Sequence, residues 1–288
     1  RLPRRPAPST PDPLGHKMAV ATEASRGRVR ARSVVTHAAE LRVAGEPSVP
    51  HPRTRSASAA LRVLVIDVGG SRVKILSTGQ TTPTKFASGP KLTAASMTSR
   101  VLRLTDGWLY DVVSIGYPGR VLQGRPLAEP HNLGCGWVGF DFQAAFKRPV
   151  RLVNDAAMQA LGGYLGGKML FLGLGTGLGS ALITDGLVEP MELGHLPYRK
   201  RTFEDYIGSR GLDRLGKTKW RRYVDDVIAR LVAAMGPEDV LIGGGNARKL
   251  KTLPSGCRRG DNADAFVGGF RLWNPAPFGD SAHTPQSN

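Results

Sequence analysis

The chain has 288 residues, enough for two modest domains with hydrophobic cores, and carries a net charge of +17. That charge predicts an anionic partner or substrate, such as nucleic acid, acidic lipid or a polyanion, with a merely basic surface as the alternative. Two cysteines exclude a four-cysteine metal site and a disulfide scaffold and favour a reducing compartment, and no apolar run reaches the roughly 18 residues that a membrane-spanning helix needs.

Residues 1–60 are rich in Arg, Pro, Ser and Ala and hold 11 Lys and Arg against 4 Asp and Glu. They show no sustained apolar periodicity, so they are predicted to be a disordered basic extension. Met18 is the first methionine, and we expect part of this extension to precede the native start. An organelle leader is the alternative, although three acidic residues after Met18 argue against it.

The composition changes at Leu61, where Leu61–Ile66 and Val73–Leu76 predict a hairpin around a glycine turn. Glycines allow close approach of an anion to backbone N–H groups, and a carboxylate at a strand end, here Asp67, can hold hydrated Mg²⁺. An ordinary hairpin with an exposed acid is the alternative. The residues predicted to bind phosphate at this turn are Gly69, Gly70, Ser71 and Lys74.

Three segments in the middle of the chain predict further strands and loops. Asp111–Gly119 is a strand that ends in a Gly/Pro turn, and Glu129–Trp137 is a polar loop. The strand Pro149–Val153 leads into Asn154 and Asp155. Asp155 either caps the following helix or belongs to an active site, because active sites of open α/β sheets lie beyond the carboxyl ends of strands.

A second glycine turn follows about a hundred residues after the first. Phe171–Ile183 again joins two apolar strands through a glycine-rich turn with a hydroxyl residue, and the repetition predicts an internal duplication. Its predicted phosphate-binding residues are Gly175, Thr176, Gly177 and Gly179.

The rest of the chain predicts a loop, three helices and one more strand. Trp220–Met235 has an apolar stripe at helical spacing and is stopped by Gly236-Pro237. The other predicted segments are a loop over Glu189–Pro197, a helix opening at Phe203, a strand and third glycine turn over Asp239–Asn246, a helix over Ala263–Trp273 and a flexible tail over residues 274–288.

In combination, these motifs resemble the ROK family of sugar kinases and sugar-sensing repressors. The segments that carry the resemblance are Asp67-Val-Gly-Gly-Ser71, Asn154-Asp155, Leu174–Gly179, Glu192-Leu-Gly-His195 and Gly243-Gly-Gly. Tyr117-Pro-Gly, Glu129-Pro-His-Asn132-Leu, Gly136-Trp-Val-Gly-Phe and Glu189–Tyr198 are similar to the polyphosphate glucokinase branch. The resemblance covers about Leu61 to Trp273.

The fold that this resemblance implies is α/β, the duplicated actin-like or ribonuclease-H-like kinase fold with two domains and a central cleft. We expect an N-terminal domain over residues 61–153, to which residues 261–273 return, and a C-terminal domain over residues 154–260.

The resemblance also implies roles for individual residues. Asp155 corresponds to the general base that accepts the proton of the sugar's 6-hydroxyl, and Asp67 is placed near Mg²⁺. The residues implied to bind the sugar, beside Asp155, are Asn132, Asn154, Glu192, His195 and Glu204. The residues that correspond to the adenosine-contacting segment are Gly244, Gly245 and Asn246.

Two features depart from the family pattern. Most bacterial members carry a Cys-rich zinc motif after Glu-x-Gly-His, whereas this chain has Leu196–Phe203 there. We therefore expect no zinc and expect another group to hold His195; the polyphosphate glucokinase branch also lacks these cysteines. Cys135 stands where proline is more usual.

The predicted function is phosphoryl transfer from polyphosphate, and also from ATP as an alternative donor, to glucose in the cytoplasm. The resemblance implies a homodimer.

An ATP-dependent hexokinase for another sugar is the alternative within the fold, and a non-catalytic sugar-responsive repressor is disfavoured because Asp155 is present and no DNA-binding module is recognised. Nucleic-acid binding is disfavoured because no aromatic-rich basic motif accompanies the charge. The candidate polyphosphate contacts are Arg199, Lys200, Arg201, Lys217, Lys219, Arg221, Arg222, Arg248, Lys249 and Lys251.

Overall fold

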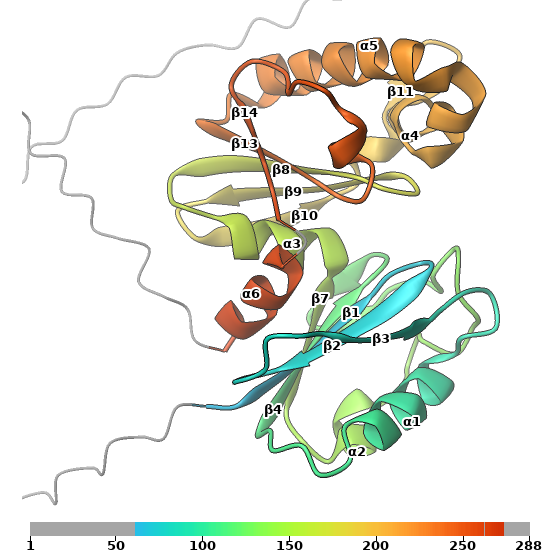
Figure 1. The fold of residues 1–288 in the computed structure, drawn as a ribbon, viewed down its shortest axis with the longest axis vertical. Helices are drawn as coiled ribbons and strands as arrows, with labels where there is room; N and C mark the ends of the chain where they lie inside the picture. Colours follow the sequence, from blue (N-terminus) through green and yellow to red (C-terminus); the bar gives the residue numbers. More distant parts are fainter. Residues whose placement is uncertain (1–60, 262, 274–288) are drawn as a thin grey trace, which may run out of the picture. The chain divides into compact units, whose positions relative to one another are not determined.

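The computed structural model describes residues 61–261 and 263–273. The predictions for residues 1–60 and 274–288 lie outside the described residues. Within the described part, the chain builds two five-stranded sheets, each with helices packed against it (Figure 1).

The first sheet begins with an antiparallel meander of β1 (Val63–Val68), β2 (Arg72–Ser77) and β3 (Thr84–Ala87). Two parallel strands, β4 (Val112–Tyr117) and β7 (Val150–Asn154), continue the sheet on the other side of β1, which gives the order β3-β2-β1-β4-β7. The predicted hairpin and the two later strands are therefore confirmed.

The second sheet repeats this topology. The strands β8 (Lys168–Leu174), β9 (Leu178–Thr184) and β10 (Leu187–Met191) form the antiparallel meander. The parallel strands β13 (Asp239–Gly243) and β14 (Cys257–Arg259) extend it, in the order β10-β9-β8-β13-β14. The duplication predicted from the two glycine turns is confirmed, since each turn joins the first two strands of its sheet.

The remaining elements connect and cover these sheets. The α-helices are α1 (Ala94–Leu104), α2 (Phe142–Phe146), α3 (Asp155–Gly163), α4 (Phe203–Ile207), α5 (Ser209–Met235) and α6 (Asp264–Arg271). The short elements are β5 (Val121–Leu122), β6 (Arg125–Pro126), β11 (Pro197–Tyr198), β12 (Arg201–Thr202) and the 3-10 turns η1 (Leu193–His195) and η2 (Ala247–Lys249).

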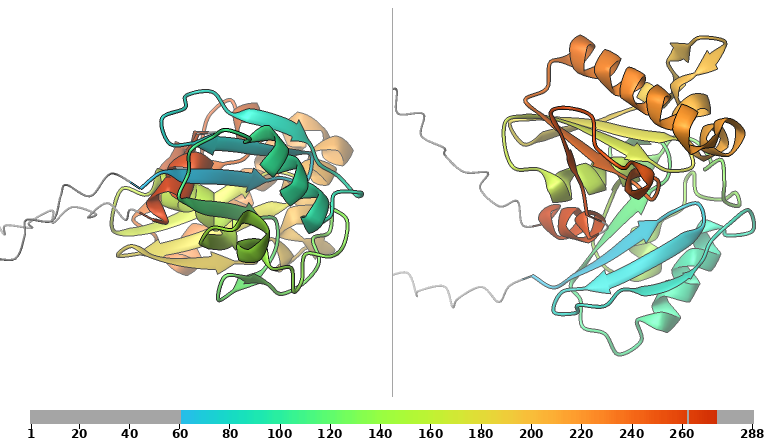
Figure 2. Two further views of the ribbon diagram at one scale, coloured as in Figure 1. Left: turned by 90° about the horizontal axis from the view of Figure 1, so that it is seen from below. Right: turned by 45° about the horizontal axis from the view of Figure 1, so that its top comes forward.

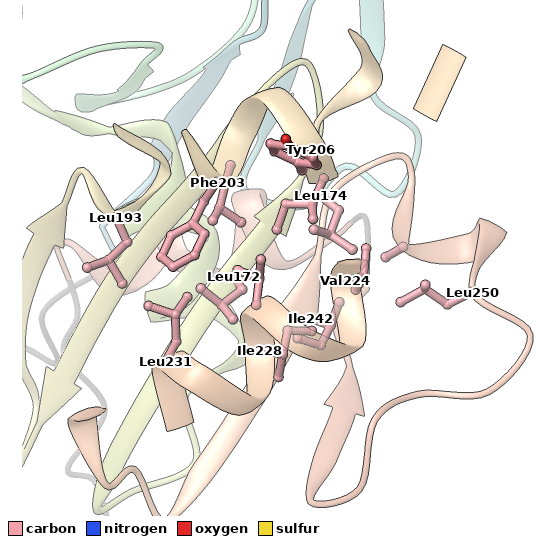
Figure 3. Close-up of a cluster of buried hydrophobic side chains, with 14 of the residues drawn as sticks. Leu172, Leu174, Leu193, Phe203, Tyr206, Val224, Ile228, Leu231, Ile242 and Leu250 are labelled. Carbon is pink, nitrogen blue, oxygen red and sulfur yellow. The ribbon is translucent and has the colours of Figure 1, made fainter. Parts of the chain in front are cut away.

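The central strands are buried on both faces, as their nearly continuous apolar sequences predict. On β8, Leu172 and Leu174 pack with α5 residues such as Ile228, as Figure 3 shows, whereas Phe171 packs on the opposite face with α3. Figure 2 shows α5 lying along this sheet. On β1, Leu64 belongs to the core covered by α1 and α2.

Helices α3 and α6 cross each other at glycines. A side chain at Gly162 would overlap the Asp264 carbonyl, and one at Gly268 would overlap the Met158 carbonyl. Helix α6 also packs on β1 and β4, while α3 packs on β8 and β9 of the second sheet and on β4 of the first, so α3 contacts both sheets (Figure 1). The predicted domain boundary at residue 153 stays a prediction.

The structure changes two of the predicted elements. Glu189–Met191, predicted as loop, lies in the edge strand β10, where the hairpin from β9 supplies backbone partners. The helix predicted over Trp220–Met235 begins earlier, at Ser209, and is interrupted at Gly216, whose φ of 71° is not helical. None of the helices in the described residues is long and apolar enough to cross a membrane.

Candidate active site

The parallel strands of the first sheet bring polar residues together at one edge. Asp67 on β1 is paired in register with Gly116 on β4, and Tyr117 is paired with Asn154 at the end of β7. Because parallel strands end at the same edge, Asp67 and Asp155 are held near each other by the sheet itself.

A pocket of about 310 Å³ opens at this edge. Both glycine turns, the segments after β4, β6 and β10, and the start of α3 contribute to its wall. The predicted site residues that line it are Gly70, Asn132, Asn154, Asp155, Gly175, Thr176, Gly177, Gly179, Glu192, His195, Glu204 and Gly244. The predicted site residues outside this lining are Asp67, Gly69, Ser71, Lys74, Gly245 and Asn246.

Asp155 occupies the first position of α3, and the helix cap is the residue before it. The Asn154 carboxamide oxygen accepts a hydrogen bond from the Ala157 N–H at 3.0 Å, and its Nδ2 donates to the Gly119 carbonyl at 3.1 Å. The alternative that Asp155 caps this helix is therefore wrong. The cap leaves the Asp155 carboxylate in the pocket wall, where Oδ1 accepts from the Ala156 N–H at 2.8 Å.

The pKa of Asp155 is raised to about 7, although some of the residue remains solvent-accessible. Burial is the main cause, and the negative charges of Asp67 and Glu192 act in the same direction, against the backbone donor at Ala156. A carboxyl group with a pKa near neutrality accepts protons efficiently at neutral pH, which suits a general base.

Asp67 lies beneath the first turn, almost fully buried, with Lys74 as its counter-ion. Lys74 Nζ donates to Asp67 Oδ2 at 2.7 Å across the β1–β2 hairpin. No group of three or more His, Cys, Asp or Glu side chains suited to a metal ion occurs among the described residues. Mg²⁺ is commonly held by one or two carboxylates together with water and substrate phosphates, so the Asp67 carboxylate fits such an ion without a larger ligand set.

Glu192, His195 and Glu204 form a cluster in the pocket lining. His195 Nδ1 lies 3.8 Å from Glu192 Oε2, and its Nε2 lies 3.9 Å from Glu204 Oε1. These separations exceed hydrogen-bond length, so all three side chains keep capacity for other partners. The His195 N–H donates to the Glu192 carbonyl at 3.1 Å, and the short turn η1 thereby orients the residue that we expected another group to hold.

The second glycine turn is fixed by neutral groups. Ser209 donates through its N–H and its hydroxyl to the Gly175 carbonyl, at 3.0 Å each. The buried Asn246 side chain donates to the same carbonyl and to the Ser209 hydroxyl, also at 3.0 Å. Asn246 is thus already engaged in positioning this turn, whereas Gly244 (φ +81°) lines the pocket directly.

Four residues of the site were not singled out from the sequence. Arg120, His131 and Gln159 line the pocket, and Glu129 holds its loop by accepting from the N–H groups of Trp137 and Val138 at 3.0–3.2 Å. His131 and Glu129 stand in the Glu-Pro-His-Asn motif, which was a usable signal. Gln159 lies four residues after Asp155 on α3, and helical spacing alone predicts that it shares that face.

Two of the candidate polyphosphate contacts are already engaged with other groups of the protein. The Arg199 guanidinium stacks over the Tyr198 and Tyr223 rings at 5.3 and 5.2 Å. Arg221 donates from Nε and Nη2 to the Lys249 carbonyl at 2.9 and 2.6 Å, which ties α5 to η2. These two arginines therefore organise the surface. Arg199 is itself exposed, and the other exposed members of the set are Lys200, Arg201, Lys217, Lys219, Arg222, Arg248 and Lys251.

The two repeated sheets around one pocket are an architecture that several solved sugar kinases share. No protein-family profile matches the chain. The structure is similar to the inorganic polyphosphate/ATP-glucomannokinase of Arthrobacter sp. strain KM (TM-score 0.66, 22% identity), with 75% of this chain and 99% of that chain covered. It is also similar to a ROK family glucokinase from Streptomyces griseus solved with glucose and AMPPNP (TM-score 0.62, 16% identity), with 75% and 100% covered.

These likenesses confirm the predicted fold class, that of the ROK sugar kinases. In sequence, the chain is similar to the polyphosphate glucokinase of Mycobacterium leprae, 29% identical over 205 residues, which are 65% of this chain. The alignment spans 60% of the length of that relative. The predicted resemblance to the polyphosphate glucokinase branch of the ROK family is therefore confirmed.

Proposed function

We propose that the protein transfers a phosphoryl group from inorganic polyphosphate to the 6-hydroxyl of glucose, with ATP as a second donor. The observation that carries the proposal is the Asp155 carboxyl group, with a pKa of about 7, in the wall of a pocket that also contains both glycine turns. The likeness to the mycobacterial polyphosphate glucokinase and to the Arthrobacter polyphosphate/ATP-glucomannokinase supports the choice of reaction.

In this proposal the pocket wall positions the sugar. Asp155 accepts the proton of the attacking hydroxyl, while Glu192, His195 and Glu204 hydrogen-bond to sugar hydroxyls and Asn132 and Asn154 complete the polar lining. Asn154 also acts through the α3 cap, because its carboxamide fixes the backbone on which Asp155 sits. A sugar with a misplaced hydroxyl leaves such groups unpaired, which is a source of specificity.

The donor phosphates are held by backbone N–H groups of the two turns. Phosphoryl transfer depends on positioning and on fixed positive charge rather than on covalent chemistry by the protein. Gly69, Gly70, Ser71 and Lys74 contribute from one side and Gly175, Thr176, Gly177 and Gly179 from the other. Asp67 would hold Mg²⁺ together with phosphate oxygens, and the ion would supply positive charge that offsets the charge of the donor.

The exposed basic residues around α5 and η2 support polyphosphate as the donor, because a long polyanion gains from a continuous basic surface. Gly244 and Gly245 provide a backbone surface for the adenosine of ATP. Asn246 contributes indirectly, because its side chain donates to the Gly175 carbonyl and so holds the second turn in place. We further propose a cytoplasmic homodimer.

The test is formation of glucose 6-phosphate by the purified full chain with Mg²⁺, using long-chain polyphosphate or ATP, and glucose or mannose as acceptor. We expect the highest kcat/KM with polyphosphate and glucose. Turnover with ATP alone would refute the donor assignment, and preference for mannose would refute the acceptor assignment. No turnover with any pair would contradict the kinase proposal itself.

A further inference from the structure

A second cavity lies outside the site described above, between the β3–α1 loop and helix α1. Its volume is about 580 Å³. The side chains that can carry a charge in its lining are Lys91, Arg100 and Arg103, and none of the described residues that line it is acidic. The lining of the cavity therefore carries positive charge without an acidic residue in the lining itself.

Two of these cations, Arg100 and Arg103, lie on one face of helix α1. Ser96, Arg100 and Arg103 recur at spacings of four and three residues, which places them side by side along α1. The opposite face, with Met97 and Val101, is buried in the core of the first sheet. The Arg100 guanidinium lies 4.6 Å from the centroid of the Phe86 ring, so its orientation is already restricted.

The cavity wall is hydrogen-bonded to the first glycine turn. Ser88, in the lining, donates from Oγ to the Gly69 carbonyl at 2.6 Å and from its N–H to the Ser71 carbonyl at 3.1 Å. A ligand that restricts the β3–α1 loop therefore also restricts the turn.

The same wall contacts the loop that carries Asn132. The Leu92 carbonyl accepts hydrogen bonds from the Gly134 N–H at 3.0 Å and from the Trp137 indole at 3.3 Å. One loop thus connects the cavity with both the first turn and the substrate side of the pocket.

We infer that this cavity is a second binding site for an oligophosphate anion. Guanidinium groups pair with phosphate oxygens through two parallel N–H donors, and two arginines one helical turn apart suit successive phosphate groups. The ligand is either the distal part of the donor chain or a separate small oligophosphate, and only the first source rests on the proposed function.

The decisive measurement is amide hydrogen exchange of the full chain, titrated with sodium tripolyphosphate. We expect saturable slowing over residues 87–103 in the wild type. The double variant Arg100→Gln/Arg103→Gln should need about tenfold more tripolyphosphate for the same slowing, because two of three cations are lost. The control Arg125→Gln/Lys147→Gln removes two exposed charges outside the cavity and should behave as the wild type.

Slowing that is absent over residues 87–103, that does not saturate, or that persists equally in the double variant would overturn the inference. This readout needs no turnover, so it stays decisive even if the proposed kinase activity fails. Unchanged exchange elsewhere in the double variant shows that it is folded.

Kinetics then distinguish the two sources. If the donor chain occupies the cavity, the double variant raises the KM for long-chain polyphosphate several-fold and leaves the KM for ATP unchanged. If a separate anion occupies it, the double variant leaves the KM for long-chain polyphosphate unchanged, and the component of the tripolyphosphate effect on the ATP-driven rate that arises at the cavity needs about tenfold more tripolyphosphate in the double variant than in the wild type.

Discussion

The two halves of the described structure share one strand topology and differ in the chemistry of equivalent positions. In the first hairpin, Asp67 and Lys74 face each other one pair before the end of the ladder and form an ion pair. In the second hairpin the corresponding positions are Gly173 and Gly179, which carry no side chain. The first half therefore carries charged side chains at its glycine turn, whereas the second half has only backbone groups at the equivalent positions.

The same contrast recurs where each sheet leads into its last helix. After β7 the chain enters α3 with Asp155 in the pocket. After β14 it enters α6 with Asp264, whose Oδ2 accepts from the Asp261 N–H at 2.7 Å and which packs against α3 glycines. Equivalent acids therefore have different surroundings, and duplication of the fold did not preserve a duplicated site.

The largest expected effect comes from replacing each of these two aspartates by asparagine. Asp155→Asn removes the proposed proton acceptor, so we expect kcat for glucose phosphorylation to fall by roughly 10²–10⁴-fold. Asp264→Asn should leave kcat within a few-fold and change stability instead. Steady-state kinetics of both variants with the same donor test this, and equal losses of kcat would contradict the functional difference.

The raised pKa of Asp155 predicts a stability cost for the site. Between its unfolded value of 3.8 and the folded value of about 7, the folded state binds more protons, so the free energy of unfolding falls as the pH rises through this range. Asp155→Asn should therefore be more stable than the wild type by an amount that grows from pH 4 to pH 7 and then stays constant, with an upper bound of about 4 kcal/mol.

Urea unfolding of both proteins at pH 5, 6, 7 and 8 measures that difference. Burial also raises the pKa of Asp264, so Asp264→Asn should show a pH dependence of the same sign, and Asp213→Asn, at an exposed position of α5, serves as the control for loss of a carboxylate. A difference that is independent of pH would show that Asp155 is not perturbed in the folded protein.

The ion pair of the first half gives a smaller effect. Lys74→Met leaves the buried Asp67 carboxylate without its counter-ion, and we expect a loss of about 2 kcal/mol in the free energy of unfolding. Lys85→Met, in the exposed cross-strand neighbour of Lys74, should change it by less than about 0.5 kcal/mol. Thermal unfolding of the two variants at equal pH compares them, and similar losses would mean that the pair contributes nothing specific.

Much of the fold could be predicted because apolar strands, glycine turns and the α5 stripe are local signals. The path of Glu189–Met191 could not, since an edge strand with Pro190 is defined by its partner β9 rather than by its own sequence. The early start of α5 was hidden because Gly211 and Gly216 weaken the helical signal.

For the site, motif residues predicted the pocket lining well but not which side chains were already engaged. The side-chain partners of Asn154 and Asn246 depend on carbonyl groups that lie 35 and 71 residues away in the chain. The ion pair of Asp67 with Lys74 likewise depends on the hairpin register. Such contacts are set by tertiary structure, so residue type and spacing alone do not determine them.

The last prediction concerns the two glycine turns themselves. A side chain at Gly177 would overlap Glu204 Oε2, which is the mobile end of a side chain, so Gly177→Ala should displace Glu204 and leave the fold intact. A Cβ at Gly70 would meet Asn132 Cβ at 3.4 Å, an ordinary contact. We therefore expect Gly177→Ala to raise the KM for glucose about tenfold, the loss of roughly one hydrogen bond to a charged group, and Gly70→Ala to change it less than about threefold. Initial rates over a glucose series at saturating donor measure both, and a larger effect at Gly70 would reverse the assignment of the sugar to the Glu204 side of the pocket.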